Sequence, residues 1–237
     1  MGCKALLDTK YKSAIVFDIG GGSTEIIWLN FNDERIPTII DWMSIPLGVV
    51  NLSEQYGTKN VLAEGQYQEM KSRVQEYLKP FEEKHSINTA IKENLVQLMG
   101  SSGTVTTLTS MHLNQKYYDR NEVDGSWIKT DDLVNLCRHL SKLDYEERLA
   151  LKNIGNDRAE LVVAGCAILE ALSEIWPVED VRVADRGIRE GMLHDLIDRQ
   201  RQKNNERRRR RNKRRKFKKH NDAKPETLPE NGKANRS

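Results

Sequence analysis

Two glycine-rich turns, each placed directly after a short apolar run, restrict the fold of this chain more than any other feature. The first run, Ala14–Asp18, leads into Gly20-Gly21-Gly22, and the second, Leu95–Met99, leads into Gly100-Ser101-Ser102-Gly103. Short apolar runs bounded by such turns are typical of buried strands. Glycine lets the chain turn tightly and bring its backbone close to a ligand. The pattern predicts an α/β fold with two backbone loops at strand ends.

The first turn carries groups that suit both a phosphate and a metal ion. Successive backbone N–H groups from Gly20 to Thr24 can form an anion-binding nest, and the hydroxyls of Ser23 and Thr24 add donors. Asp18 and Glu25 flank the turn. Carboxylates that close to a phosphate make sense with a hard cation such as Mg²⁺ between them, although one of them could instead polarise a water molecule. A plain hairpin turn is the alternative interpretation.

The second turn lies between a strand and a helix that is expected from Thr104 to about His112. A helix N-terminus offers free N–H groups and a partial positive charge, so Gly100 to Thr104, with Ser101, Ser102 and Gly103, could clamp the same phosphate chain. The turn is not a P-loop, because that motif needs a lysine and none occurs between Gly100 and Ser110. A turn without any ligand remains the alternative here too.

Apolar periodicity predicts the remaining elements. Further strands are expected at Thr24–Leu29, Thr38–Ile45 and Asp180–Asp185. Helices are expected at Asn60–Lys84, Asp131–Leu140, Asp157–Trp176 and from Gly187 onward, the third of them deeply buried. Thr130 and Asp144 are the predicted N-caps of two helices.

The net charge of +3 conceals an acidic body and a basic arm. Arg199–Lys219 holds 14 lysines and arginines and one acid, Glu206, so the first 198 residues are acidic overall. The dense cationic segment Arg207–Lys219 favours contact with polyphosphate or nucleic acid, with a solvated tail as the alternative. Residues 199–237 are predicted to be a basic, largely disordered tail. No apolar run approaches the ~18 residues of a membrane span, and no secretory signal is evident, which favours a cytoplasmic protein without membrane contact.

Five stretches, taken together, resemble one known family. They are Phe17–Glu25, Asp41–Val50, Gly100–Thr107, Asp157–Glu170 and Val183–Met192. In this order they are similar to the exopolyphosphatase / guanosine pentaphosphate phosphatase family, and the resemblance covers residues 2 to 198. It implies an actin-like ATPase fold of the sugar kinase, Hsp70 and actin type, with an incomplete first domain followed by the second. It also implies hydrolysis of the terminal phosphate of polyphosphate or of guanosine pentaphosphate.

The same resemblance implies roles for particular residues. Asp18 and Glu25 would serve Mg²⁺ and the attacking water, and the two glycine-rich loops would hold the phosphates. Phosphoryl transfer needs alignment and charge neutralisation more than covalent help, which is consistent with such a site.

The chain also departs from the family pattern. Members carry an earlier domain portion and a glutamate-rich segment before the first motif, and no glutamate precedes Glu25 here. We therefore expect a fragment with little hydrolase activity of its own. A non-catalytic phosphate-binding remnant and a nucleic-acid-associated protein are the alternatives. The strand Ala14–Asp18 is expected to be an open apolar edge that favours self-association, and pairing into a homodimer is a further expectation.

Overall fold

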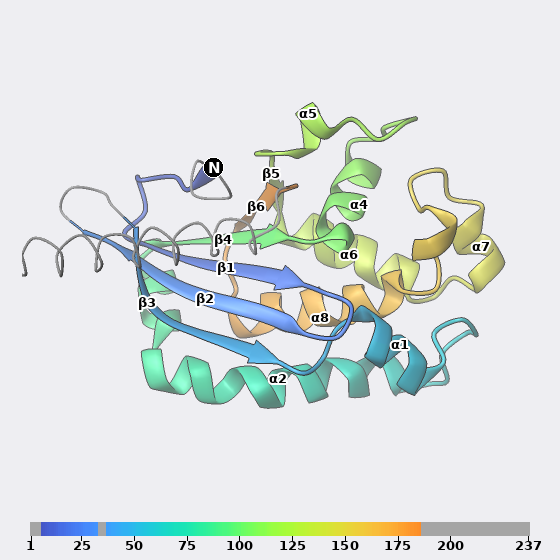
Figure 1. Cartoon of the computed structure of the whole chain (residues 1–237), viewed down its shortest axis with the longest axis horizontal. Helices are drawn as coiled ribbons and strands as arrows, with labels where there is room; N and C mark the ends of the chain where they lie inside the picture. Colours follow the sequence, from blue (N-terminus) through green and yellow to red (C-terminus); the bar gives the residue numbers. More distant parts are fainter. Residues whose placement is uncertain (1–5, 33–36, 186–237) are drawn as a thin grey trace, which may run out of the picture. The chain divides into compact units, whose positions relative to one another are not determined.

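A six-stranded mixed sheet organises the computed structural model, which describes residues 6–32 and 37–185 (Figure 1). The strand order is β3-β2-β1-β4-β6-β5. The strands are β1 Ser13–Ile19, β2 Thr24–Phe31, β3 Pro37–Ile45, β4 Val96–Ser101, β5 Trp127–Lys129 and β6 Asp180–Ala184. β1, β4 and β6 run parallel, whereas β2, β3 and β5 pair antiparallel with their neighbours. The predicted α/β fold is confirmed, and the first glycine turn joins β1 and β2 as an antiparallel β-hairpin.

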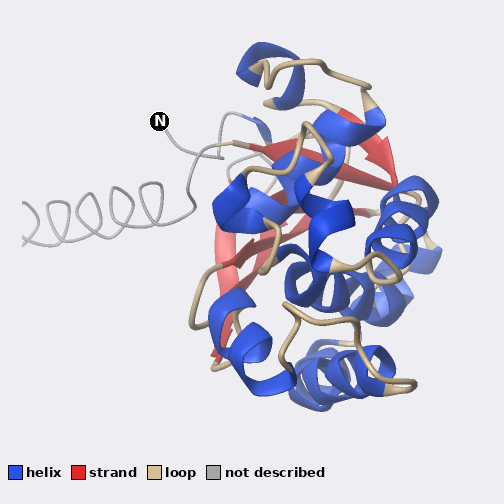
Figure 2. Ribbon diagram, turned by 90° about the vertical axis from the view of Figure 1, so that its right-hand side faces the viewer, coloured by secondary structure: helices blue, strands red, loops and turns tan. Residues whose placement is uncertain are grey.

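Helices pack against one face of this sheet and complete a single apolar core. They are α1 Val49–Tyr56, α2 Gln66–His85, α3 Ile87–Lys92, α4 Gly103–His112, α5 Arg120–Val123, α6 Thr130–Leu140, α7 Tyr145–Leu149 and α8 Val162–Ile175. Ile15 and Phe17 of β1 belong to the core cluster together with residues of α2, α4, α6 and α8. Figure 1 shows α2 and α8 running along the sheet, and Figure 2 shows the layer of helices beside the strands in an orthogonal view.

α8 is the buried helix that the sequence predicts. Its first twelve residues are all buried, because it lies against α1, α2, α4 and α6. Glu170 is the one acid among them, and its carboxylate accepts hydrogen bonds from Lys71, Arg138 and Tyr67. A carboxylate can be buried in this way only when its oxygens are satisfied.

Several sequence predictions need correction. β1 is not an edge strand, because it pairs with β2 on one side and β4 on the other; the edges of the sheet are β3 and β5. Thr130 is not an N-cap, since its hydroxyl donates to the carbonyl of Val178. α8 begins only at Val162, after a short 3₁₀ turn at Asn156–Arg158. The predicted cap at Asp144 is confirmed as a capping box with Glu147.

Other predictions fall outside what the structure describes. The helix expected from Gly187 onward, the tail at residues 199–237 and its cationic segment Arg207–Lys219 are not among the described residues, so they stay predictions. Among the described helices, none combines the length and the apolar character needed to cross a membrane.

Candidate functional site

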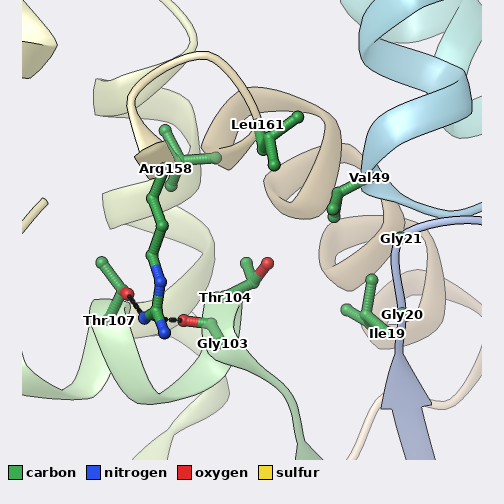
Figure 3. A pocket seen from close by; sticks show the side chains of 10 residues that line it. Ile19, Gly20, Gly21, Val49, Gly103, Thr104, Thr107, Arg158 and Leu161 are labelled. Carbon is green, nitrogen blue, oxygen red and sulfur yellow. Dashed lines mark hydrogen bonds between the residues drawn. The ribbon is translucent and has the colours of Figure 1, made fainter. Parts of the chain in front are cut away.

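The two glycine-rich loops meet because the strands that precede them are parallel neighbours. In the register of β1 and β4, Asp18 lies beside Ser101, so both strands end at the same edge of the sheet. A cavity of about 140 Å³ opens there (Figure 3). Its walls come from both loops, from α1 and from the start of α8, with Ile19, Gly20, Gly21, Val49, Gly103, Thr104, Thr107, Arg158, Leu161 and Val162 as lining residues. The volume is several times the roughly 30 Å³ that one water occupies in the liquid, so a small anion fits.

The first glycine loop is held by the N-terminus of α1. The N–H groups of Val49 and Val50 donate to the carbonyls of Gly20 and Gly21 at 2.9 and 2.8 Å, and the side chain of Asn51 donates to the carbonyl of Gly22 at 2.9 Å. The loop carbonyls are thus engaged by α1. Among the described residues, no backbone carbonyl accepts a hydrogen bond from the N–H groups of Gly21, Gly22 or Ser23. Three successive unfilled donors are what an anion-binding nest requires.

The second loop supplies the N-terminus of a ten-residue helix. Ser102 is the N-cap of α4, and its hydroxyl oxygen accepts a hydrogen bond from the N–H of Val105 at 3.1 Å. Thr106 N–H donates to the carbonyl of Ser102. The N–H groups of Gly103 and Thr104 have no acceptor within the described part of the chain. They add two donors and the positive end of the helix dipole to the cavity wall.

Arg158 adds a formal positive charge that the sequence analysis did not identify. Its Nη1 donates to Gly103 O at 3.2 Å and to Thr107 Oγ1 at 2.8 Å (Figure 3). None of the ion pairs found among the described residues involves it. The sequence held one indication of this role. Arg158 stands just before a helix, where a cation interacts unfavourably with the helix dipole, so a partner other than that helix was to be expected.

The two acids lie at the same edge, on the sheet face away from the core helices. Asp18 sits between Phe17 and Ile19, which both point into the core, so its side chain points to the other face. Glu25 is its direct partner on β2. Glu25 Oε1 accepts hydrogen bonds from Ser23 Oγ at 2.5 Å and Ser44 Oγ at 3.3 Å, while Oε2 is buried and has no hydrogen-bond partner among the residues that the structure describes.

These acids can hold a hydrated magnesium ion but not a protein-only metal cage. The described residues contain no cluster of three or more His, Cys, Asp or Glu side chains suited to a metal. Mg²⁺ commonly binds through one or two carboxylates and completes its shell with water and substrate phosphates. Two adjacent carboxylates, one with an unpartnered oxygen, fit that arrangement.

Two of the predicted phosphate ligands have a structural role in the loop or the core. Thr24 is fully buried and its hydroxyl donates to the carbonyl of Leu47 at 2.8 Å, so it holds the loop rather than facing the cavity. A Cβ at Gly100 would lie 2.5 Å from the ring of Phe17, so packing of the core requires this glycine. Of the ten predicted residues, Gly20, Gly21, Gly103 and Thr104 line the cavity. Gly22, Ser23, Ser101 and Ser102 lie in the same two loops.

Comparison with known proteins places these features in one family. Residues 2–200 match the Ppx/GppA phosphatase family. A guanosine-5′-triphosphate,3′-diphosphate pyrophosphatase of Pseudoalteromonas atlantica is 24% identical over 197 residues, 81% of this chain and 35% of that protein. Exopolyphosphatase 2 of Mycobacterium tuberculosis is 25% identical over 182 residues, 75% of this chain and 54% of that protein. The chain therefore spans about half, or less, of the length of these relatives.

A solved structure agrees with the sequence comparisons. The exopolyphosphatase of Cytophaga hutchinsonii superposes with a TM-score of 0.67 at 26% identity, covering 83% of this chain and 61% of that one. The likeness confirms the predicted actin-like ATPase fold for the part of the fold that this chain contains.

Proposed function

Because the chain belongs to the Ppx/GppA phosphatase family, we propose that it binds the phosphoanhydride chain of inorganic polyphosphate or guanosine pentaphosphate and takes part in hydrolysis of the terminal phosphate. One observation carries the proposal. Five backbone N–H groups lack a backbone acceptor among the described residues, three in the glycine loop and two at the start of α4. Three of these residues, Gly21, Gly103 and Thr104, line the cavity together with Arg158. Such donors bind phosphate oxygens.

The chain's own residues have separable tasks in this proposal. The nest and the α4 N-terminus fix the phosphate oxygens, and Arg158 neutralises part of their charge. Oε2 of Glu25 would be the oxygen left for a water or a metal ion, because Oε1 already accepts hydrogen bonds from two serine hydroxyls. Asp18 and Glu25 would hold Mg²⁺, which supplies charge neutralisation for the transferring phosphoryl group. The acids and the cavity lie on either side of the same glycine loop, so phosphate and metal can be brought together there.

Binding of tripolyphosphate tests the cavity. Arg158→Gln removes one charge from its wall and should weaken tripolyphosphate binding by about three- to tenfold, which corresponds to ~0.7–1.4 kcal/mol for an exposed charge-assisted hydrogen bond. Lys79→Gln is the matched control, because Lys79 is exposed on the outer side of α2 and carries the same charge. Titration calorimetry in EDTA measures both variants. Equal losses in the two variants would show that only net charge matters and would remove the cavity from the proposal.

Turnover separates the enzyme from a binding module. Release of phosphate from polyphosphate and guanosine pentaphosphate with Mg²⁺, abolished in Asp18→Asn and Glu25→Gln, supports hydrolysis. Tight binding of tripolyphosphate without any release would instead favour the non-catalytic phosphate-binding alternative.

A further inference from the structure

A row of polar side chains crosses the sheet at the edge where the glycine loops lie. The strand registers place Ser101 beside Asp18, Asp18 beside Glu25 and Glu25 beside Ser44, on β4, β1, β2 and β3 respectively. Cross-strand partners share a face of the sheet. The next row on the same face, two residues farther from this edge on each strand, is apolar, and its members are Met99, Val16, Ile27 and Trp42. The polar row therefore borders an apolar row on the same face of the sheet.

The carboxylate of Glu25 is held asymmetrically within this row. Both hydrogen bonds, from Ser23 and Ser44, go to Oε1. Within residues 6–32 and 37–185, Oε2 has no hydrogen-bond partner although its surface is buried. A buried carboxylate oxygen without a partner is unfavourable, and such atoms in folded proteins call for a ligand, an ion or a functional reason.

The two serines hold Glu25 from different elements. Ser23 belongs to the glycine loop and would follow any adjustment of that loop to a phosphate. Ser44 belongs to β3, a nine-residue strand, and is the direct cross-strand partner of Glu25. A strand gives a more rigid platform than a loop for orienting a functional side chain.

We propose that Ser44 is a positioning residue: its hydroxyl anchors Glu25 Oε1 to the sheet, so that Oε2 is presented to a hydrated divalent cation. The proposal deepens the proposed function, on which it rests, by adding a residue outside both glycine-rich loops. Ser44 touches neither substrate nor metal in this scheme and acts through Glu25 alone.

A double-mutant cycle on Mn²⁺ binding tests it, with Mn²⁺ alone as the probe and free Mn²⁺ quantified by electron paramagnetic resonance. Ser44→Ala should weaken Mn²⁺ binding about three- to tenfold, less than for a short buried hydrogen bond to a charged group, because this bond is exposed and 3.3 Å long. Ser44→Thr keeps the hydroxyl and should restore most of the affinity. In a Glu25→Gln background, Ser44→Ala should change nothing further. Thr38→Ala, which removes an exposed hydroxyl from the same strand, is the control and should bind Mn²⁺ like the wild type.

Three results would overturn the proposal: no Mn²⁺ site that depends on Glu25, unchanged affinity in Ser44→Ala, or an equal loss in the wild-type and Glu25→Gln backgrounds. The last result would mean that Ser44 supports the fold generally. Metal-free tripolyphosphate titration keeps this test apart from the proposed function. If tripolyphosphate binds in EDTA but Ser44→Ala leaves the Mn²⁺ affinity intact, only the role of Ser44 fails. If the coupling is present but tripolyphosphate does not bind, the cavity assignment fails.

Discussion

Gly48 offers a sharp test of how the first glycine loop is held. It is the N-cap of α1 and has φ −131° and ψ 179°, an extended conformation that any residue can adopt. Glycine is therefore required at this position for steric reasons and not for its backbone conformation. A Cβ at this position would lie 2.5 Å from Gly20 O and 2.5 Å from both the carbonyl carbon and the oxygen of Gly21. These are backbone atoms, which cannot move aside by changing a rotamer.

Gly48→Ala must separate α1 from the loop. The hydrogen bonds from Val49 and Val50 to the loop carbonyls would lengthen or break, and each contributes about 0.5–1.5 kcal/mol. Overpacking of a tight contact typically adds about 1–3 kcal/mol. Because partial relaxation makes these contributions overlap, the expected loss in the free energy of unfolding is about 2–4 kcal/mol. The displaced loop should also bind tripolyphosphate more weakly.

Urea unfolding followed by circular dichroism measures the first effect, with the slope of the transition checked for constancy. Gly22→Ala is the control, because nothing lies within 4 Å of a Cβ there and its φ is not in the left-handed region. It should change the free energy of unfolding by less than about 0.5 kcal/mol. A Gly48→Ala variant as stable as Gly22→Ala would refute the steric reasoning and, with it, the view that α1 shapes the nest.

Two further predictions concern ionic contacts away from the cavity. The side chain of Glu170 is 2% exposed and forms ion pairs with both Lys71 and Arg138. Glu170→Gln should therefore lower the free energy of unfolding by about 3 kcal/mol. Glu174→Gln, at a carboxylate that is 38% exposed and also pairs with Lys71, should lose less than about 1 kcal/mol; equal losses in urea unfolding would contradict the expectation. Hydrogen bonds from Lys84 and His85 lower the pKa of Asp41 below its usual range. The Asp41 carboxylate therefore stabilises the fold above the unfolded pKa of about 3.9, and this contribution is lost as the pH falls below it. The stability difference between wild type and Asp41→Asn should be constant above about pH 5 and should shrink as the pH falls from about 4 toward about 2, whereas a difference independent of pH would show that Asp41 does not act through its charge.

The sequence was sufficient to predict those parts of the fold that depend on residues close together in the chain. The hairpin of β1 and β2, the turn into α4 and the capping box at Asp144 each depend on residues within a few positions of one another. Convergence of the two glycine loops also followed, because parallel strands place their carboxyl ends at one edge. The position of β1 in the sheet did not follow, since its neighbour β4 is far along the chain and only the assembled structure shows that both of its edges are paired.

The residues missed in the candidate site share a different property: their roles depend on contacts between distant segments. Arg158 reaches α4 across 55 and 51 positions to Gly103 and Thr107, and Ser44 meets Glu25 only through the register of two strands. Thr24 and Gly100, conversely, look like phosphate ligands in sequence because serine, threonine and glycine suit such loops, yet the Thr24 hydroxyl donates to the carbonyl of Leu47 and Gly100 packs closely against Phe17. A glycine-rich motif therefore identifies where a loop approaches its ligand but does not separate the residues that contact the ligand from those that shape the loop. In the described part of the chain, the N–H groups of Gly21, Gly22, Ser23, Gly103 and Thr104 have no backbone acceptor, and on that ground we propose them as the phosphate ligands.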